Sequence, residues 1–118
     1  MTESNKIKRG FVYLVNLNPT IGAEINKVRP AVVVSNDINN QYAETVTIVP
    51  ITSSRIDKVY PFEVFIPKGA ANLDKDSKAK ANQIRTVDKK RIASELGKLP
   101  EDLIKKLDAA VKIHLDLE

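Results

Sequence analysis

The sequence lacks several residues on which common enzyme mechanisms depend. It contains no cysteine, which excludes disulfides and thiolate chemistry. Its one histidine, His114, excludes a mechanism that needs a histidine pair, and we interpret it as a partly buried packing residue. Carboxylates with metal-ligand spacing and a glycine-rich phosphate loop are also missing. We therefore expect neither a metal ion nor a cofactor.

Long apolar runs are missing as well. No segment approaches the roughly 18 residues of a membrane span, and the N-terminus lacks the apolar core of a signal peptide. These patterns predict a cytoplasmic protein with no membrane partner. Because the 118 residues show no repeat or linker, we expect one domain over 1–118, with 1–7 as a flexible tail.

Aromatic residues are scarce, while positive charge is concentrated in one segment. Aromatics make up 5% of the chain, so a broad base-stacking platform is not obvious. The net charge is +4, and residues 74–91 are dominated by basic side chains. Such a segment indicates either a polyanionic partner or a solvated, lysine-rich surface. Its members are Lys75, Lys78, Lys80, Arg85, Lys89, Lys90 and Arg91.

The order of elements predicts a mainly β fold that ends in a helix. Apolar runs indicate five strands, at 11–17, 31–34, 45–51, 61–66 and 79–87. Residues 38–41 are typical of a turn, and 88–96 of a short helix or turn. After Pro100, apolar residues recur at helical spacing. We expect a small, strongly bent antiparallel sheet or barrel capped by a C-terminal helix.

Two of these strands have polar groups at their ends. Arg29 enters the strand at 31–34, and Thr52 leaves the strand at 45–51. If the strands pair, a guanidinium and a hydroxyl meet at one rim, where they could hold a phosphate. RNA supplies its own 2′-OH nucleophile, so such a site could cleave RNA without a metal. The alternatives are an ion pair of Arg29 with Glu24, and a Thr52 hydroxyl bonded to its own backbone.

Five ordered motifs resemble the MazF toxins of the PemK/MazF family of type II toxin–antitoxin systems. They are RGFVYLV from Arg9, NPTIGAE from Asn18, VRPAVVV from Val28, VPIT from Val49 and NQIRTVDKKR from Asn82. The resemblance implies a Src-homology-3-like barrel of the CcdB/PemK type and a homodimer. It also implies a sequence-specific, metal-independent endoribonuclease that cuts single-stranded RNA, mainly messenger RNA. The implied products carry 2′,3′-cyclic phosphate and 5′-hydroxyl ends.

The resemblance also assigns roles to residues. Arg29 would carry proton transfer and charge stabilisation, and Thr52 would position the scissile phosphate. The implied RNA-binding residues are Glu24, Asn36, Ser53, Gln83 and Arg85. The loop at 21–28 is either a substrate flap, which an antitoxin tail can displace or order, or a plain connection. A MazE-like antitoxin with an acidic tail is the implied protein partner.

Two departures and two alternatives stay open. Phe11 stands where many relatives have aspartate, and Asn26-Lys27 where some have two glycines. The first alternative is a gyrase-binding toxin like CcdB without nuclease activity, although the C-terminus lacks the aromatic that would favour it. The second is a non-catalytic nucleic-acid-binding module, for which the basic segment 74–91 suffices.

Overall fold

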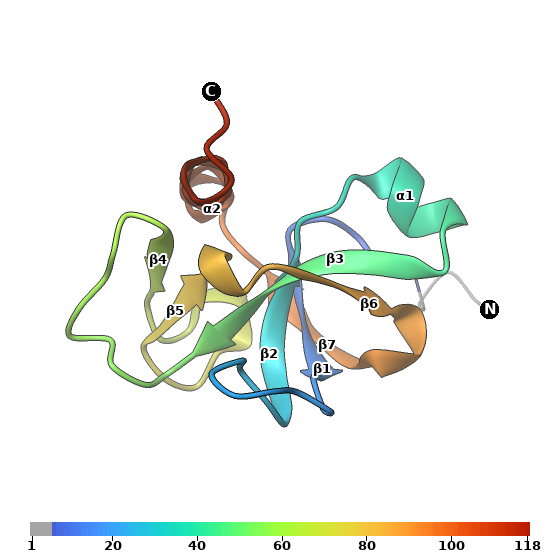
Figure 1. The fold of residues 1–118 in the computed structure, drawn as a ribbon, viewed down its shortest axis with the longest axis horizontal. Helices are drawn as coiled ribbons and strands as arrows, with labels where there is room; N and C mark the ends of the chain where they lie inside the picture. Colours follow the sequence, from blue (N-terminus) through green and yellow to red (C-terminus); the bar gives the residue numbers. More distant parts are fainter. Residues whose placement is uncertain (1–5) are drawn as a thin grey trace.

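The computed structural model describes residues 6–118, which form an antiparallel sheet with a long helix against it (Figure 1). The expected fold class, mainly β with a C-terminal helix, is confirmed. The strands are β1 (Phe11–Asn16), β2 (Val28–Val33), β3 (Thr45–Thr52), β4 (Glu63–Ile66), β5 (Ser77–Lys80), β6 (Arg85–Asp88) and β7 (Ile92–Lys98). The helices are α1 (Asp37–Tyr42) and α2 (Glu101–His114), with single 3₁₀ turns η2 (Ala70–Asn72), η3 (Ala81–Gln83) and η4 (Lys89–Arg91).

Strand β3 is the centre of the sheet. It pairs with β2 through its middle, with β6 through its first half and with β5 through its last residues. The strand order is β4-β5-β3-β2-β1-β7, with β6 beside β3. No pairing joins β4 to β7 among the described residues, so the sheet is bent but open rather than a closed barrel.

Both faces of the sheet are buried, as the nearly continuous apolar runs predict. Successive side chains of a strand point to opposite faces, and Val12 and Tyr13 accordingly belong to different core clusters. The Val12 cluster includes Leu103 and Leu107 of α2. The Tyr13 cluster lies on the other face, where Ile7 packs against it. Packing therefore begins inside the predicted tail 1–7, of which 1–5 lie outside the described residues.

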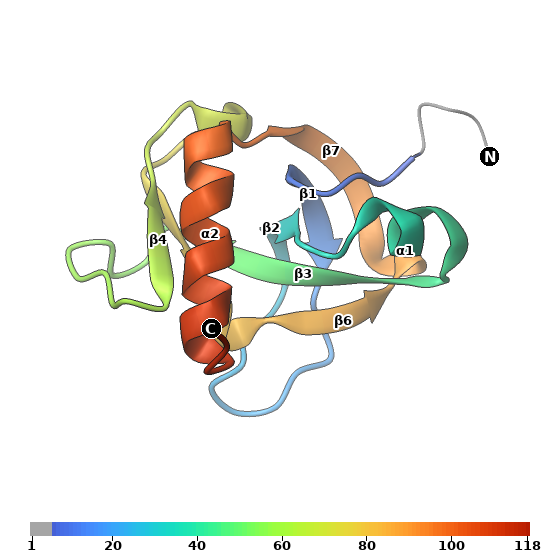
Figure 2. The same ribbon diagram turned by 90° about the horizontal axis from the view of Figure 1, so that it is seen from above.

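Helix α2 follows the predicted apolar stripe but not to its end. Leu103, Leu107 and Ala110 are buried, and the helix lies across the sheet beside β4 (Figure 2). Pro100 precedes the first turn, where Glu101 supplies negative charge that favours a helix start. The prediction for His114 is wrong. It is exposed, because burial ends before the last helical turn.

The predicted strand at 79–87 is really two strands separated by η3. Between the pairs Ile51–Ala79 and Ile48–Arg85 the chain advances three residues along β3 but six along its partner. The three additional residues form η3, which lifts Gln83 out of the ladder. The prediction of one strand was wrong because apolar alternation does not reveal a local insertion.

Two further elements differ from the prediction. Residues 88–96 were expected to be a short helix or turn, but they form η4 and most of β7. Pairing with β1 overrides the helical preference of this stretch. Residues 38–41 belong to helix α1 rather than a turn. Asn36 caps that helix by accepting a hydrogen bond from the Asn39 N–H at 2.8 Å, and asparagine serves caps as readily as turns.

Candidate active site

The sheet places Arg29 and Thr52 at the same end. Strands β2 and β3 are antiparallel, with Ala31 paired to Pro50, so the start of β2 lies beside the end of β3. The same register continued by two residues would set Arg29 opposite Thr52. The β2–β3 ladder ends at Ala31 and Pro50, and on its other edge β3 pairs with β5 through Thr52 and Lys78. The expected meeting of a guanidinium and a hydroxyl at one rim thus agrees with the strand pairing.

Both side chains keep hydrogen-bonding capacity for a ligand. Arg29 is half-buried, and among the described residues only its Nε donates a hydrogen bond, to the Asn26 carbonyl at 3.1 Å. Its two terminal NH₂ groups can therefore form the paired contacts that phosphate accepts. The Thr52 hydroxyl oxygen accepts from the Ser54 N–H at 3.1 Å, so its own proton is still available. The alternative for Thr52, a hydroxyl bonded to its own backbone, is present and is compatible with this role.

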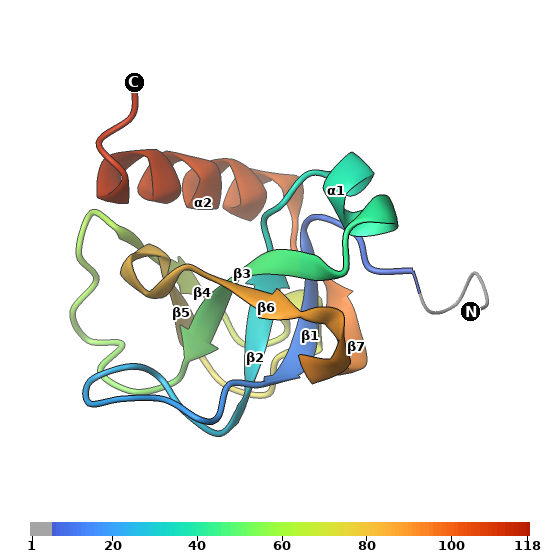
Figure 3. The same ribbon diagram turned by 45° about the vertical axis from the view of Figure 1, so that its right-hand side comes forward.

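The loop at 17–27 leaves this end of the sheet (Figure 3). Hydrogen bonds hold it at its base and its middle. The Leu17 N–H donates to the Lys27 carbonyl at 3.0 Å, which closes the base. Gln83 lies beside the middle of the loop. Its Oε1 accepts from the Ile25 N–H at 3.3 Å, and its Nε2 donates to the Ala23 carbonyl at 3.5 Å. The insertion η3 thus joins the loop to the sheet.

Glu24 and Arg85 already form hydrogen bonds with backbone groups of this same loop. The Glu24 carboxylate accepts from the Ile21 N–H at 2.6 Å within an exposed turn, and it forms no ion pair with Arg29 in the described part of the chain. Arg85 donates from Nη1 to the Leu17 carbonyl at 3.1 Å. Each keeps free polar atoms, yet each also shapes the loop beside Arg29.

The remaining predicted residues lie at opposite ends of the sheet. Ser53 is exposed and directly follows Thr52. Asn36 follows the end of β2, whereas Arg29 lies at its start, so β2 separates them. Because the Asn36 side chain already caps α1, the structure gives it a local role and does not bring it together with Arg29.

Lys78, the ladder partner of Thr52, belongs to a buried ion pair that was not predicted from the sequence. The Lys78 Nζ lies 3.0 Å from Glu63 Oε1, with side chains 4% and 2% exposed. Lys78 also donates to the Lys58 carbonyl at 2.8 Å, and Glu63 Oε1 accepts from the Tyr60 N–H at 3.0 Å. The pair thus fixes the loop at 53–62, which begins directly after Thr52.

The charge balance of this pair favours the ionised carboxylate. Burial raises the pKa of Glu63, but the hydrogen bonds from the Tyr60 N–H and the Lys78 ammonium and the charges of Lys78 and Lys80 outweigh it. The pKa of Glu63 consequently lies below its ordinary value of 4.5. Lys78 of the basic segment 74–91 is therefore paired with a carboxylate inside the fold, and its charge is not exposed to a binding partner.

The basic segment 74–91 contains both exposed basic side chains and basic side chains that hydrogen-bond to the protein's own backbone. Lys75 and Lys90 are exposed, as a solvated surface or a polyanion site requires. Lys78 and Arg91 instead hold the chain, since Arg91 donates to the Asn16 carbonyl at 3.1 Å. Arg85 contacts the Leu17 carbonyl, and Arg29 directly follows Val28, the ladder partner of Asn16, so three arginines lie around the base of the loop at 17–27. This concentration favours an anionic ligand there.

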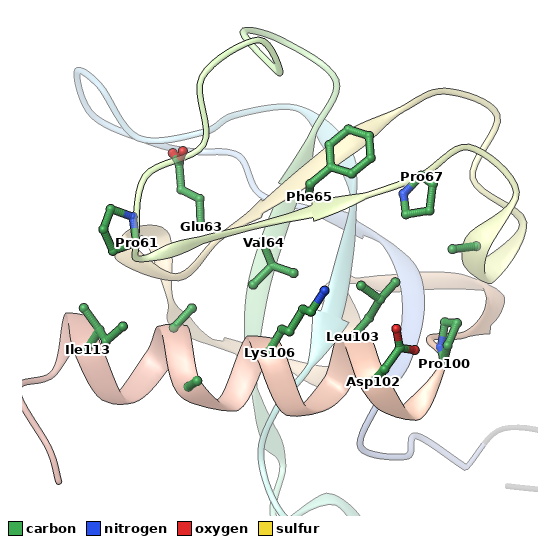
Figure 4. A pocket seen from close by; sticks show the side chains of 13 residues that line it. Pro61, Glu63, Val64, Phe65, Pro67, Pro100, Asp102, Leu103, Lys106 and Ile113 are labelled. Atoms are coloured by element: carbon green, nitrogen blue, oxygen red, sulfur yellow. The ribbon is translucent and has the colours of Figure 1, made fainter.

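A separate groove of about 560 Å³ lies between α2 and β4 (Figure 4). Val64 and Leu103 face each other across it, and Lys106 reaches in from the helix. Neither Arg29 nor Thr52 is among the residues that line it. Within 6–118, no three histidine or acidic side chains gather where they could bind a metal ion. The helices of that part of the chain are also too short or too polar to cross a membrane.

Comparison with known proteins identifies relatives across nearly the whole chain. The model of the family described as "PemK-like, MazF-like toxin of type II toxin-antitoxin system" matches residues 8–115. Endoribonuclease MazF9 of Mycobacterium tuberculosis (strain ATCC 25618 / H37Rv) is 42% identical over 116 residues, which cover 94% of this chain and 98% of that protein.

Solved structures of similar proteins have the same fold. The crystal structure of MazF from Deinococcus radiodurans superposes with a TM-score of 0.82 at 27% identity, over 94% of this chain and 97% of that one. An endoribonuclease in complex with its cognate antitoxin, from a mycobacterial species, gives a TM-score of 0.79 at 23% identity. That match covers 95% of this chain and 97% of the other.

Proposed function

Because the chain belongs to the family of PemK-like, MazF-like toxins of type II toxin–antitoxin systems, we propose that it is a sequence-specific endoribonuclease for single-stranded RNA. The observation that supports this most is the shared position of Arg29 and Thr52 at one end of the sheet, with unused donors on both. The relationship to a curated endoribonuclease supports the same activity. Messenger RNA is the substrate class that the family resemblance implies.

The chemistry needs no metal ion. The 2′-oxygen of the RNA attacks the adjacent phosphorus, and the bond from phosphorus to the 5′-oxygen breaks. The 2′-OH loses its proton and the leaving 5′-oxygen gains one, which gives a 2′,3′-cyclic phosphate and a 5′-hydroxyl. Arg29 donates hydrogen bonds to the nonbridging oxygens and stabilises the charge that grows on them. Proton transfer by Arg29 is the further role that the resemblance implies.

Thr52 orients the same phosphate through its hydroxyl proton. Glu24, Ser53, Gln83 and Arg85 lie in or beside the two loops that flank this end of the sheet, where they would contact nucleotides next to the cleaved one. Asn36 would reach RNA only along the length of β2.

The partners proposed for this chain are a second copy of itself and a MazE-like antitoxin with an acidic tail. Solved structures of similar proteins include MazE–MazF assemblies from Deinococcus radiodurans. The arginines around the base of the loop at 17–27 would attract an acidic tail, which would exclude RNA by occupying the surface beside Arg29. The described part of the chain contains no membrane-spanning helix, and we propose that the protein acts in the cytoplasm.

The test is cleavage of a long mixed-sequence RNA in the presence of a chelator, with the product ends mapped. Wild type should give discrete cuts with cyclic-phosphate ends. Arg29→Ala should lose at least about 100-fold in rate, since one oxyanion donor contributes 10²–10³. Lys90→Ala, which removes an exposed charge from the basic segment 74–91, is the matched control and should keep the wild-type pattern.

Three results would contradict the proposal. Absence of cuts in several unrelated RNAs would favour a protein target such as gyrase. Cuts that persist in Arg29→Ala would remove Arg29 from the mechanism. Cleavage of a substrate with 2′-deoxyribose at the mapped site would exclude attack by the 2′-OH.

A further inference from the structure

The loop at 53–62 contains an aromatic pair with a cation above it. The rings of Tyr60 and Phe62 are parallel, at an interplanar angle of 1°, with centroids 5.5 Å apart. The Lys58 Nζ lies 5.3 Å from the centroid of the Tyr60 ring. Tyr60 is 44% exposed, although a ring of this size would gain free energy from burial. The sparse aromatics of the chain are thus partly gathered at one place on its surface.

Glu63 forms hydrogen bonds with both the N–H and the carbonyl of Tyr60. The Tyr60 N–H donates to Glu63 Oε1 at 3.0 Å, and the Tyr60 carbonyl accepts from the Glu63 N–H at 2.8 Å. Two residues earlier, the Lys58 carbonyl accepts from the buried Lys78 Nζ at 2.8 Å. A ring on a backbone held in this way is preorganised, so little conformational entropy is lost when a ligand contacts it.

The same contacts connect the aromatic pair to Thr52. Lys78, whose ammonium holds the Lys58 carbonyl, is the ladder partner of Thr52. The loop also starts at Ser53, directly after Thr52. The Tyr60 ring is therefore separated from the candidate phosphate site by one strand pairing and one lysine side chain.

We propose that the Tyr60 ring, with Lys58 beside it, binds one unpaired base of the RNA that flanks the cleaved phosphate. This proposal rests on the ribonuclease function proposed above and adds a stacking subsite to it. The Phe62 ring stacks on the Tyr60 ring in a parallel, offset arrangement, and the Lys58 ammonium lies over the Tyr60 ring. The base would replace the ammonium on the ring, and the released ammonium would pair with a backbone phosphate.

The neighbouring Phe62 ring and the buried Glu63 carboxylate together restrict the conformations of the Tyr60 side chain and backbone. An isolated exposed tyrosine would adopt several rotamers and lose them on binding. Here Phe62 stacks on the ring, while Glu63 fixes the backbone on which both rings stand. Stacking is tolerant of base identity, so we expect Tyr60 to contribute affinity and position more than sequence preference.

The test uses an RNA that contains the mapped cleavage sequence with 2′-deoxyribose at the scissile position, so that it binds without being cut. 2-Aminopurine replaces one flanking base at a time, because its fluorescence falls when it stacks on an aromatic ring. At one flanking position, wild type and Tyr60→Phe should quench the fluorescence, and Tyr60→Leu should not. Tyr60→Leu should also bind the RNA about 5- to 140-fold more weakly, the range for loss of one stacked base.

Two further measurements keep the test decisive. Tyr60→Leu retains apolar volume, and its thermal unfolding is compared with wild type so that misfolding is recognised. Should Tyr60→Leu prove unfolded, Lys58→Met provides the second readout, because it should retain quenching and reduce the salt dependence of binding. Equal quenching by wild type and a folded Tyr60→Leu, or no quenching at any flanking position, would overturn the stacking subsite and leave the ribonuclease intact. A wild type that cleaves no RNA would overturn both proposals.

Discussion

The buried pair of Lys78 and Glu63 permits a quantitative prediction about stability. Lys78→Met keeps an unbranched side chain of similar length but removes the ammonium, which leaves the Glu63 carboxylate in an interior site. The two side chains are 4% and 2% exposed. Breaking a pair of this kind from one side costs about 3–5 kcal/mol, because the remaining charge stays buried and keeps only the longer contact with Lys80, at 3.7 Å. That cost is a large part of the roughly 5–15 kcal/mol that stabilises an ordinary domain.

The double variant separates the pair from its surroundings. Glu63→Gln keeps an oxygen that can accept from the Tyr60 N–H, but it removes the charge. Lys78→Met combined with Glu63→Gln should therefore cost less than the sum of the single changes, by about 1–3 kcal/mol. A difference of this size between the loss in the double variant and the sum of the single losses would show that the two charges interact directly.

Urea unfolding at a fixed protomer concentration measures these differences, since assembly would otherwise change the apparent stability. With a urea dependence of about 1–3 kcal/mol/M, a loss of about 3–5 kcal/mol lowers the midpoint of Lys78→Met by about 1–5 M. Lys75→Met, an exposed position in the same basic segment, is the matched control and should stay within about 0.5 kcal/mol of wild type. Equal midpoints for Lys78→Met and Lys75→Met, or strictly additive changes in the double variant, would refute the reasoning.

Two other predictions concern acid stability and strand packing. The pKa of Glu63 lies below 4.5 in the folded protein, so its contribution to stability is complete above the unfolded pKa and is lost as the pH falls through the folded value. Thermal unfolding from about pH 3 to 7 should accordingly show a steeper acid loss in wild type than in Glu63→Gln, and parallel curves would contradict this. Gly97→Ala in β7 would place a Cβ 3.1 Å from the Ala71 backbone and 3.0 Å from Asn72 Nδ2. It should cost about 1–3 kcal/mol in urea unfolding, whereas Ser94→Ala, exposed on the same strand, should change little.

The spacing of apolar residues correctly predicted the helix and strands whose conformation follows from their own side-chain pattern. The leucines at 103 and 107 indicated α2, and the runs around Val12, Val32 and Ile48 indicated the three central strands. Arg29 and Thr52 could be placed at one rim because their positions follow from antiparallel pairing alone. These features depend on local spacing, which a single sequence records.

Features that depend on contacts between distant segments were missed. β7 has a locally helical composition and becomes a strand only beside β1. Lys78 and Glu63 are 15 positions apart, and nothing in the sequence around Lys78 indicates that this lysine is buried against a carboxylate. The Tyr60–Phe62 pair did leave a signal, since alternate residues of an extended segment point to the same side. The low overall aromatic content concealed it.

The position of β3 between three partner strands has a consequence for how such a protein can change over generations. Its residues from Val46 to Ile51 are almost wholly buried, so the strand tolerates few substitutions. The loops at 17–27 and 53–62 begin beside its end, and most of their side chains are exposed. New loop sequences can therefore alter what is recognised while the strand that carries Thr52 stays in place. Recognition can diverge quickly in this arrangement, and the chemistry can be inherited unchanged.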